Sequence, residues 1–373
     1  MKSILTFVLL LMIMPCMAQK DKLHKTNKNY SFYVGTYTKG DSQGIYTYKL
    51  LKDGSLKNIG LVAKSENPSF LTWSHDKKFL LAVNETNPKG GTGTVESYSI
   101  NGDRLTFISR SSSGGAHPCF VATNASDFVL TANYTSGNVG LLQLNKKGEL
   151  SDILDIQQHT SKGISDRQKS AHAHSAWFDF DNKSIISVDL GTNELLFSQL
   201  DEANQKLKPS NPEKIEMSPG AGPRHLTFHP NKKWIYVINE LDCTVTFLQK
   251  NNDGKYNKGA SFSTLPEGFT KENTCADIHT SSDGRFVYAS NRGHNSIAVF
   301  EVNINNGSLK LIAHESTKGE SPRNFSLSPN GEFLLVANQL TNNIVSFKRD
   351  KNTGLLKFID QIGAPTPVCI LFH

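Results

Sequence analysis

The sequence contains few cysteines, and none stands in a paired motif. Five of the 373 residues are cysteine, and no two of them have the C-x-x-C spacing of a zinc site or a thiol redox site. Four lie beyond the N-terminal region, far apart in the chain: Cys119, Cys243, Cys275 and Cys369. Four cysteines can pair in three ways, so disulfides are the alternative, but we expect mostly free, buried thiols.

Long hydrophobic runs are absent beyond the first eighteen residues. No other apolar run approaches the ~20 residues that a membrane-spanning helix needs, so we expect no membrane span. At the N-terminus, Lys2 precedes the apolar run "ILTFVLLLMIMP", and small residues precede a cleavage point after Ala18. This pattern predicts a signal peptide over residues 1–18, followed by a flexible segment over residues 19–29.

The predicted signal peptide implies export, so we expect a periplasmic or secreted protein. A lipid anchor on Cys16 is the weaker alternative, because Pro15 stands where a small residue usually precedes a lipidated cysteine.

The sequence also lacks a strong charge imbalance. Its 40 basic and 34 acidic residues give a formal net charge of +6, without a basic run or a recognisable nucleic-acid-binding module. We therefore expect no nucleic-acid partner. The G-x-S-x-G motif of a serine nucleophile is absent too, so the sequence does not indicate a covalent acyl-enzyme.

A repeat of about fifty residues runs through the chain instead, and sustained helical periodicity is absent. Each copy has an apolar strand, a polar turn and a second apolar strand that ends at an Asn or Asp, and the six anchors are Asn84, Asn133, Asp189, Asn239, Asn291 and Asn338. A third strand such as "TVTFLQK" and a weaker fourth strand follow. Repeated four-stranded antiparallel sheets are typical of an all-β propeller.

The two ends of the chain supply complementary parts of one further repeat. Residues 31–50 match only the second and third strands, whereas residues 365–373 match only the first. With the six whole copies they make seven blades, and pairing of the N-terminal with the C-terminal strand closes the ring. We therefore predict a single seven-bladed β-propeller domain over residues 30–373. A β-sandwich or two smaller β domains would not explain the complementary half-repeats.

Chemically active residue types occur at two equivalent positions of the repeat. The start of the first strand and the end of the second lie at the same edge of an antiparallel hairpin, so both should face one mouth of the central channel. Three consecutive repeats place there our candidate catalytic residues, His174, Arg224, Glu240 and Arg292, and the half-repeat places Thr36 there. A structural ion-pair network at the blade junctions is the alternative.

The pair His172 and His174 raises the question of a metal. Residues two apart on a strand point to the same face, but no third His, Cys or carboxylate is spaced to complete a metal site. We therefore expect no metal and no organic cofactor. Which of the two histidines is functional stays open at this point.

Four segments together resemble a known family: "FYVGTYTKGDSQGIYTYKL", "RQKSAHAHSAWFDFD", "GAGPRHLTFHPNKKWIYVINEL" and "SNRGHNSIAVF". They resemble the lactonase family of seven-bladed propellers, which includes propeller-type 6-phosphogluconolactonases and fungal carboxy-cis,cis-muconate cyclases. The similarity covers the whole chain after residue 18. The family's matching motifs supply a His, two Arg and a Glu to its proposed active site, and by motif these are the same four residues in this chain. The pair Arg167 and Gln168 before the H-x-H is also common in the family.

The resemblance implies hydrolysis of an anionic or sugar lactone to its aldonic acid, in the manner of a 6-phosphogluconolactonase. Either Glu240 or His174 would act as general base toward water and the other as acid toward the leaving oxygen. One of Arg224 and Arg292 would stabilise the oxyanion, and the other would hold an anionic substituent. We assign substrate contacts to His172, Arg167, Asn239, Asn291 and Arg323.

Export favours a substrate other than the cytosolic phosphogluconolactone, so we expect a non-phosphorylated lactone outside the cytoplasm. Two rival functions stay open. One is the reverse reaction, in which an unsaturated diacid cyclises to a lactone. The other is a non-catalytic ligand-binding propeller, because this fold hosts many unrelated functions.

Overall fold

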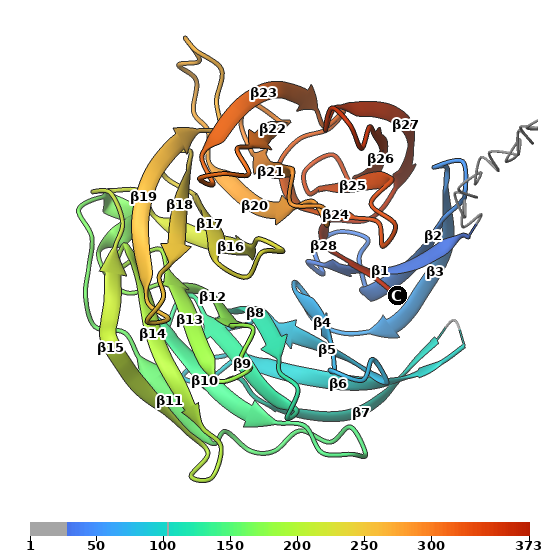
Figure 1. Ribbon diagram of the computed structural model, residues 1–373. Coiled ribbons are helices and arrows are strands. Elements are labelled where there is room, and N and C mark those ends of the chain that lie inside the picture. The colour runs from blue at the N-terminus through green and yellow to red at the C-terminus, as the bar shows by residue number, and fades with distance from the viewer. Residues whose placement is uncertain (1–27, 103) are drawn as a thin grey trace, which may run out of the picture.

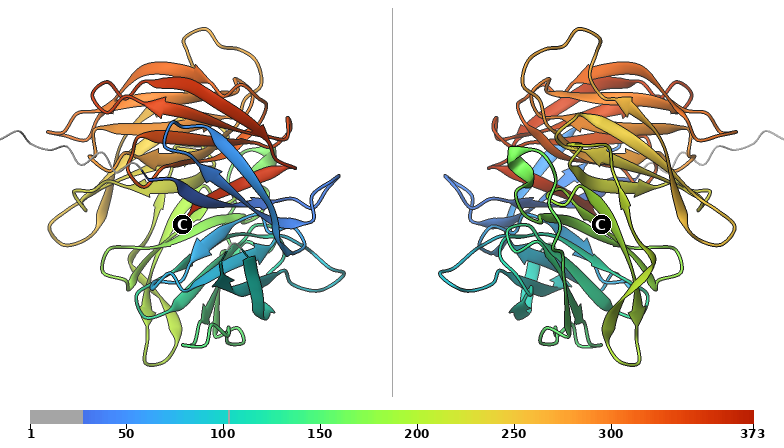
Figure 2. Two further views of the ribbon diagram at one scale, coloured as in Figure 1. Left: turned by 90° about the vertical axis from the view of Figure 1, so that its right-hand side faces the viewer. Right: turned by 90° about the vertical axis from the view of Figure 1, so that its left-hand side faces the viewer.

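The computed structural model describes residues 28–102 and 104–373. The predicted signal peptide and residues 19–27 of the predicted flexible segment lie outside the described residues. The described chain forms seven four-stranded antiparallel sheets, which stand around a central axis as the blades of a propeller (Figure 1). The side views show the blades as one ring of strands with loops projecting at both rims (Figure 2). The all-β, seven-bladed prediction is confirmed.

The strands of blades 1 to 4 follow one another from the channel outward. Blade 1 contains β28 (Pro367–Phe372), β1 (Tyr30–Thr36), β2 (Gly44–Leu50) and β3 (Leu56–Lys64). Blade 2 contains β4 (Leu71–Trp73), β5 (Phe79–Asn84), β6 (Thr94–Asn101) and β7 (Arg104–Ser112). Blade 3 contains β8 (Pro118–Thr123), β9 (Phe128–Asn133), β10 (Asn138–Gln143) and β11 (Asp155–Gln158). Blade 4 contains β12 (Ala173–Phe178), β13 (Ser184–Asp189), β14 (Glu194–Asp201) and β15 (Lys206–Glu216).

The remaining three blades repeat this order. Blade 5 contains β16 (Pro223–Phe228), β17 (Trp234–Asn239), β18 (Thr244–Lys250) and β19 (Tyr256–Ser263). Blade 6 contains β20 (Cys275–Thr280), β21 (Phe286–Asn291), β22 (Ser296–Val302) and β23 (Leu309–Ser316). Blade 7 contains β24 (Pro322–Leu327), β25 (Phe333–Asn338), β26 (Asn343–Arg349) and β27 (Leu356–Gly363).

Both ends of the described chain complete blade 1. Strand β28 pairs antiparallel with β1, and Ile370 lies opposite Val34. In Figure 1 the red β28 accordingly lies beside the blue β1. The predicted closure of the ring by residues 31–50 and 365–373 is therefore confirmed, and β3 adds the fourth strand.

Apolar side chains fill the spaces between neighbouring blades. The second strands β17 and β25 are buried at every residue, because another blade covers each of their two faces. The cluster that joins blades 5 and 6 includes Tyr236, Ile238, Val287 and Ala289, all fully buried. The outermost strands such as β15 are largely exposed. The second strands therefore read as nearly continuous apolar runs instead of alternating polar and apolar residues.

The anchor of each repeat holds the strand ends in place. Asn239 donates from Nδ2 to the hydroxyls of Thr244 and Thr246, both at 2.8 Å. Asn291 donates to the carbonyl of Thr264, which belongs to the preceding blade, at 2.9 Å. The residue that follows each anchor is thereby fixed at the channel mouth.

Two other sequence predictions concern the cysteines and the membrane. The four cysteines of the described chain are free and buried, as predicted. The helix η1 (Asp166–Gln168) is a single 3₁₀ turn between β11 and β12. No helix within residues 28–102 and 104–373 is long and apolar enough to cross a membrane.

Candidate active site

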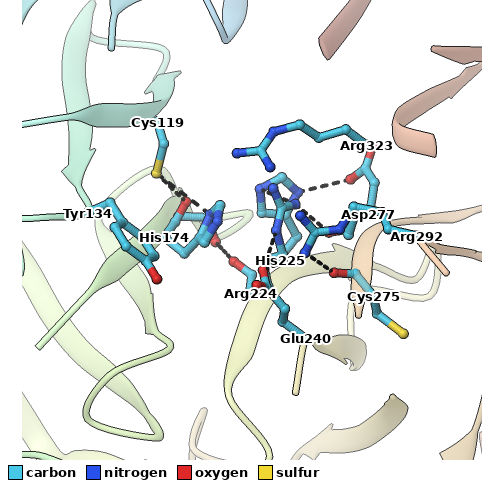
Figure 3. A network of polar contacts seen from close by, with 12 residues as sticks. Cys119, Tyr134, His174, Arg224, His225, Glu240, Cys275, Asp277, Arg292 and Arg323 are labelled. Atoms are coloured by element: carbon cyan, nitrogen blue, oxygen red, sulfur yellow. Dashed lines mark hydrogen bonds and ion pairs between the residues drawn. The ribbon is translucent and has the colours of Figure 1, made fainter. Parts of the chain in front are cut away.

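The strand ends at one mouth of the channel enclose a cavity of about 250 Å³. The residues that line it are Glu85, Cys119, Tyr134, Arg167, His174, Glu240, Thr274, Arg292 and Arg323. Arg224 lines a smaller hollow that adjoins the cavity and shares Glu85, Cys119 and Arg323 with it. The structure therefore brings together the four predicted catalytic residues, and their side chains converge in Figure 3.

Glu240 lies at the centre of the charge network. It follows β17, and its carboxylate lies 3.0 Å from Nε of Arg224, 2.9 Å from Nη2 of Arg292 and 3.1 Å from Nη2 of Arg167. Burial by itself would raise the pKa of Glu240, but the charges of these arginines outweigh burial and lower the pKa to about 2. Glu240 is therefore ionised at physiological pH.

A buried chain of contacts holds Arg224 in place. Its Nη1 donates to the carbonyl of Ala276 and lies 3.3 Å from Nε2 of His225. Nδ1 of His225 lies 2.9 Å from the Asp277 carboxylate. A guanidinium only donates hydrogen bonds, so His225 accepts at Nε2 and donates from Nδ1. Burial, with the charge of Arg224, lowers the pKa of His225 to about 4, which agrees with a neutral ring.

His174, on β12, presents an imidazole to the cavity. Nδ1 lies 3.6 Å from Sγ of Cys119, and the ring meets those of Tyr134 and His225 edge to face, with centroids 5.4 Å apart in both pairs. Nε2 has no hydrogen-bond partner among the described residues. Burial lowers the pKa of His174 well below its usual value, and the charge of Arg224 lowers it further. The ring is therefore neutral at physiological pH.

His172 lies beside the cavity and supports one of its walls. Its ring stacks on Tyr134, with centroids 4.5 Å apart and planes at 13°. Nδ1 of His172 donates to the carbonyl of Tyr134 at 2.9 Å, and its backbone N–H donates to Asp189. Of the two histidines, His174 is the one that faces the cavity.

Arg323 reaches the cavity from β24, on the opposite side of the ring. Its Nη2 donates to the hydroxyl of Tyr37 at 2.9 Å, and the Tyr37 hydroxyl donates to the Glu85 carboxylate, 2.9 and 3.0 Å from its two oxygens. Arg167 comes from η1 and also donates to the hydroxyl of Tyr134 at 3.0 Å. Four guanidinium groups and two carboxylates thus surround the cavity and its hollow, a formal surplus of two positive charges.

The structure does not bring Asn239 and Asn291 to the cavity. Both side chains are fully buried and bond to hydroxyl and carbonyl groups of the blade framework. The predicted substrate contacts included both, and each precedes a lining residue in the chain, but successive residues of a strand point to opposite faces. Of the predicted substrate contacts, Arg167 and Arg323 line the cavity.

Sequence reasoning missed several neighbours of the site, among them Tyr37 and Asp277. Thr36 was assigned to the position after the anchor, but in the structure Thr36 pairs with Pro367, as Asn133 pairs with Pro118. Thr36 is therefore the anchor equivalent, and Tyr37 follows it at the channel mouth. A one-residue shift in the alignment of the half-repeat would have found Tyr37.

Asp277 carries a network that no short motif signals. Its carboxylate contacts His225 and His279 at 2.9 and 3.1 Å and accepts a hydrogen bond from Nδ2 of Asn324 at 2.6 Å. These partners belong to blades 5, 6 and 7. Within the part of the chain that the structure describes, no group of three His, Cys, Asp or Glu side chains is arranged to hold a metal ion.

Comparisons with known proteins match nearly the whole described chain. The family model "Lactonase, 7-bladed beta-propeller" matches residues 31–372. The chain is 38% identical over 301 residues to the 6-phosphogluconolactonase of Bacillus subtilis (strain 168), covering 79% of this chain and 84% of that protein. It is 36% identical over 306 residues to the 6-phosphogluconolactonase of Formosa agariphila, covering 79% and 85%.

Among solved structures, the Pseudomonas aeruginosa periplasmic gluconolactonase PpgL superposes with a TM-score of 0.88 at 30% identity, covering 92% of this chain and 99% of that one. With these matches, the chain belongs to the lactonase family of seven-bladed β-propellers and is an enzyme of that family.

Proposed function

We propose that this enzyme hydrolyses a sugar lactone to the corresponding aldonic acid. The observation that carries the proposal is the cavity, in which the neutral imidazole of His174 lies among guanidinium groups clustered around an ionised carboxylate. Relatives named 6-phosphogluconolactonase and gluconolactonase support a lactone substrate.

In this proposal His174 is the group that transfers protons. Water adds to the ring carbonyl while Nε2 of His174 accepts a proton from it, and the imidazolium then donates that proton to the ring oxygen as the carbon–oxygen bond breaks. The low pKa of His174 keeps the ring neutral before attack and makes the imidazolium a strong acid toward the leaving oxygen. The imidazole is regenerated, and the product acid releases its own proton.

The arginines stabilise the negative charge that develops on the oxyanion. Burial and neighbouring positive charges lower the pKa of Arg224 only to about 10, so it stays protonated at neutral pH. Nε of Arg292 is buried without a hydrogen-bond partner among the described residues, and an unpaired donor of this kind can serve a developing oxyanion. Glu240 is ionised and fixes both guanidinium groups, so we give it a positioning role instead of a proton-transfer role.

We further propose that the lactone is non-phosphorylated and is encountered outside the cytoplasm. The positive surplus of the cavity has a use without a phosphate group, because the oxyanion and the product carboxylate are both negative. The signal-peptide pattern of residues 1–18 and the similarity to a protein named a periplasmic gluconolactonase support this choice.

A lactone panel tests the activity. D-glucono-1,5-lactone, its 6-phosphate and other aldonolactones are compared with their spontaneous hydrolysis, with His174→Ala as the control. We expect acceleration that the variant loses by ~10²–10⁴-fold, the contribution of one proton-transfer group. No acceleration of any lactone would overturn the activity, whereas a higher kcat/KM for the phosphorylated lactone would overturn only the choice of substrate.

The site of action needs a separate measurement. Mass spectrometry of the protein from its native cells should find a mature chain that begins at Gln19. Recovery of intact Met1 on a cytosolic protein would contradict export.

A further inference from the structure

Two of the four buried thiols lie together at the junction between blades 5 and 6. Cys243 belongs to the turn between β17 and β18, and Cys275 begins β20 of the next blade. Both are members of the apolar cluster that joins these two blades. The other two, Cys119 and Cys369, belong to blades 3 and 1. Cys243 and Cys275 are far apart in the chain, so the packing of the blades brings them together.

The place of Cys243 in the repeat does not favour cysteine. This turn position, four residues after the anchor, has a positive φ in six blades, and its residues there are Gly40, Gly137, Asn193, Cys243, Asn295 and Asn342. Glycine adopts this left-handed conformation without steric cost, and asparagine adopts it more readily than most residues. The φ of Cys243 is 58°, so the turn itself gives no reason for a cysteine in blade 5.

Cys275 departs from the repeat as well. The residue that pairs with the anchor at the start of the first strand is proline in four blades, namely Pro118, Pro223, Pro322 and Pro367. Blade 4 has Ala173 at this position, and blade 6 has Cys275. The two unusual cysteines therefore stand in neighbouring blades, on the two sides of one junction.

At three other junctions the turn residue bonds to the next blade. Its Oδ1 accepts a hydrogen bond from the backbone N–H that precedes the first strand, in the pairs Asn193 with Gly222 at 2.8 Å, Asn295 with Ser321 at 3.0 Å and Asn342 with Thr366 at 2.8 Å. Cys243 has no such oxygen, and among the described residues its side chain makes no hydrogen bond to the equivalent Thr274. The junction between blades 5 and 6 has the two thiols instead.

Hydrogen bonds hold the two sulfur atoms in one cluster. Nδ2 of Asn273 donates to Sγ of Cys243 at 3.2 Å and to Oδ1 of Asn291 at 3.1 Å. Sγ of Cys275 lies 3.2 Å from that same Oδ1. The two thiols also make a side-chain hydrogen bond with each other. The sulfur atoms are therefore neighbours within the junction.

Cys243 is the more reactive of the two thiols. The hydrogen bond from Cys275 lowers the pKa of Cys243 against the effect of burial, and the Asn273 amide lowers it further. Burial raises the pKa of Cys275. Cys243 is 6% exposed beside the exposed Asp242, whereas Cys275 is fully buried. Because the thiolate is the form that reacts with oxidants, a small oxidant should react with Cys243 first.

We propose that Cys243 and Cys275 form a disulfide when the protein meets hydrogen peroxide, and that this disulfide cross-links blades 5 and 6. The Cys243 thiolate attacks the O–O bond, which gives a sulfenic acid on Cys243 and releases hydroxide. Sγ of Cys275 then attacks Sγ of Cys243, the S–O bond breaks, and the leaving oxygen takes the thiol proton of Cys275. The hydroxide takes the proton that Cys243 lost. The two thiols give up two electrons, and the peroxide is reduced to two molecules of water.

The cross-link would restrain one wall of the catalytic cavity. The backbone N–H of Cys275 donates to the carbonyl of Glu240 at 3.0 Å, and the Cys275 carbonyl accepts a hydrogen bond from Nη2 of Arg292 at 2.8 Å (Figure 3). A disulfide at this point replaces the connection that asparagine provides at other junctions. It also reduces the conformational entropy of the unfolded chain, so we expect the oxidised protein to be the more stable form.

Peptide mapping tests the disulfide. Wild-type protein that is treated with hydrogen peroxide and digested without reduction should yield the peptide of Cys243 linked to the peptide of Cys275, and dithiothreitol should separate them. Cys243→Asn introduces the residue that blades 4, 6 and 7 carry at this turn, and it should abolish the linked peptide. Cys369→Ala removes a buried thiol of blade 1 as the matched control, and it should retain the linked peptide.

Thermal unfolding tests the cross-link between the blades. The oxidised wild type should have a Tm several degrees above that of the reduced wild type, and dithiothreitol should reverse the rise. Cys243→Asn and Cys275→Ala, each compared with its own reduced form, should show no rise after the same treatment.

Two outcomes would overturn the proposal. If peroxide leaves the wild type without the linked peptide, or oxidises the two sulfurs separately, the pair is not a disulfide site. If the linked peptide forms and Tm does not rise, the disulfide does not stabilise the junction.

Discussion

At the scale of single residues, burial and charge separate the roles of Glu240 and His174. Both side chains are almost completely buried. Three guanidinium groups surround the carboxylate of Glu240 and keep it ionised, whereas burial and the positive charge of Arg224 keep the imidazole of His174 neutral. The arginines therefore keep Glu240 as an anion, and together with burial they keep His174 neutral and available as a base.

Replacement of Glu240 by Gln should lower kcat by ~10²-fold or more, because an amide no longer fixes the guanidinium groups that face the oxyanion. The loss of one partner of a buried ion pair should also lower the free energy of unfolding by ~3–5 kcal/mol, measured by urea denaturation. The pH dependence of kcat should keep its shape, since Glu240 does not carry the transferred proton. Wild-type kcat in the folded variant would contradict this role.

The pH dependence of kcat/KM reports on His174. The base must be neutral, and its pKa is lowered well below the usual ~6.5, so the active form persists as the pH falls through that value. We expect kcat/KM to stay level from about pH 8 to well below pH 6.5 and to fall only in more acidic solution. A decrease centred near pH 6.5 would indicate an unperturbed histidine in the site.

At the scale of the elements, each strand end is positioned by the anchor beside it. Asn239→Ala removes two hydrogen bonds that join the end of β17 to β18. We expect thermal or urea unfolding to show a loss of ~1–3 kcal/mol, with KM for the lactone unchanged because Asn239 does not line the cavity. A higher KM at unchanged stability would instead support a substrate contact.

At the scale of the whole molecule, stability depends on closure of the ring. Deletion of residues 19–50 removes β1 and β2 from blade 1 and leaves β28 without its partner. The deletion should expose the faces of blades 2 and 7 and lower Tm sharply, as measured by circular dichroism. An unchanged Tm in the truncated protein would contradict closure by the two ends.

The sequence by itself determined the repeat, the number of blades and the pairing of the two ends. Alternating apolar strands and polar turns are local properties, and the positions of Arg224 and Glu240 within the repeat follow from the edge geometry of a hairpin. The strands, the turns and the repeat could be predicted because each depends on residues close together in the chain, and the pairing of the two ends followed from their complementary half-repeats.

Only the tertiary structure decided which residues meet across blades. It selected His174 over His172, identified Tyr37 through the pairing of β1 with β28, and showed that Asn239 points into the framework. The charge state of Glu240 depends on Arg292 and Arg224 and then on Arg167, which is 73 positions away in the chain. Contacts over such separations are fixed by the packing of blades around the axis, and a local pattern does not encode them.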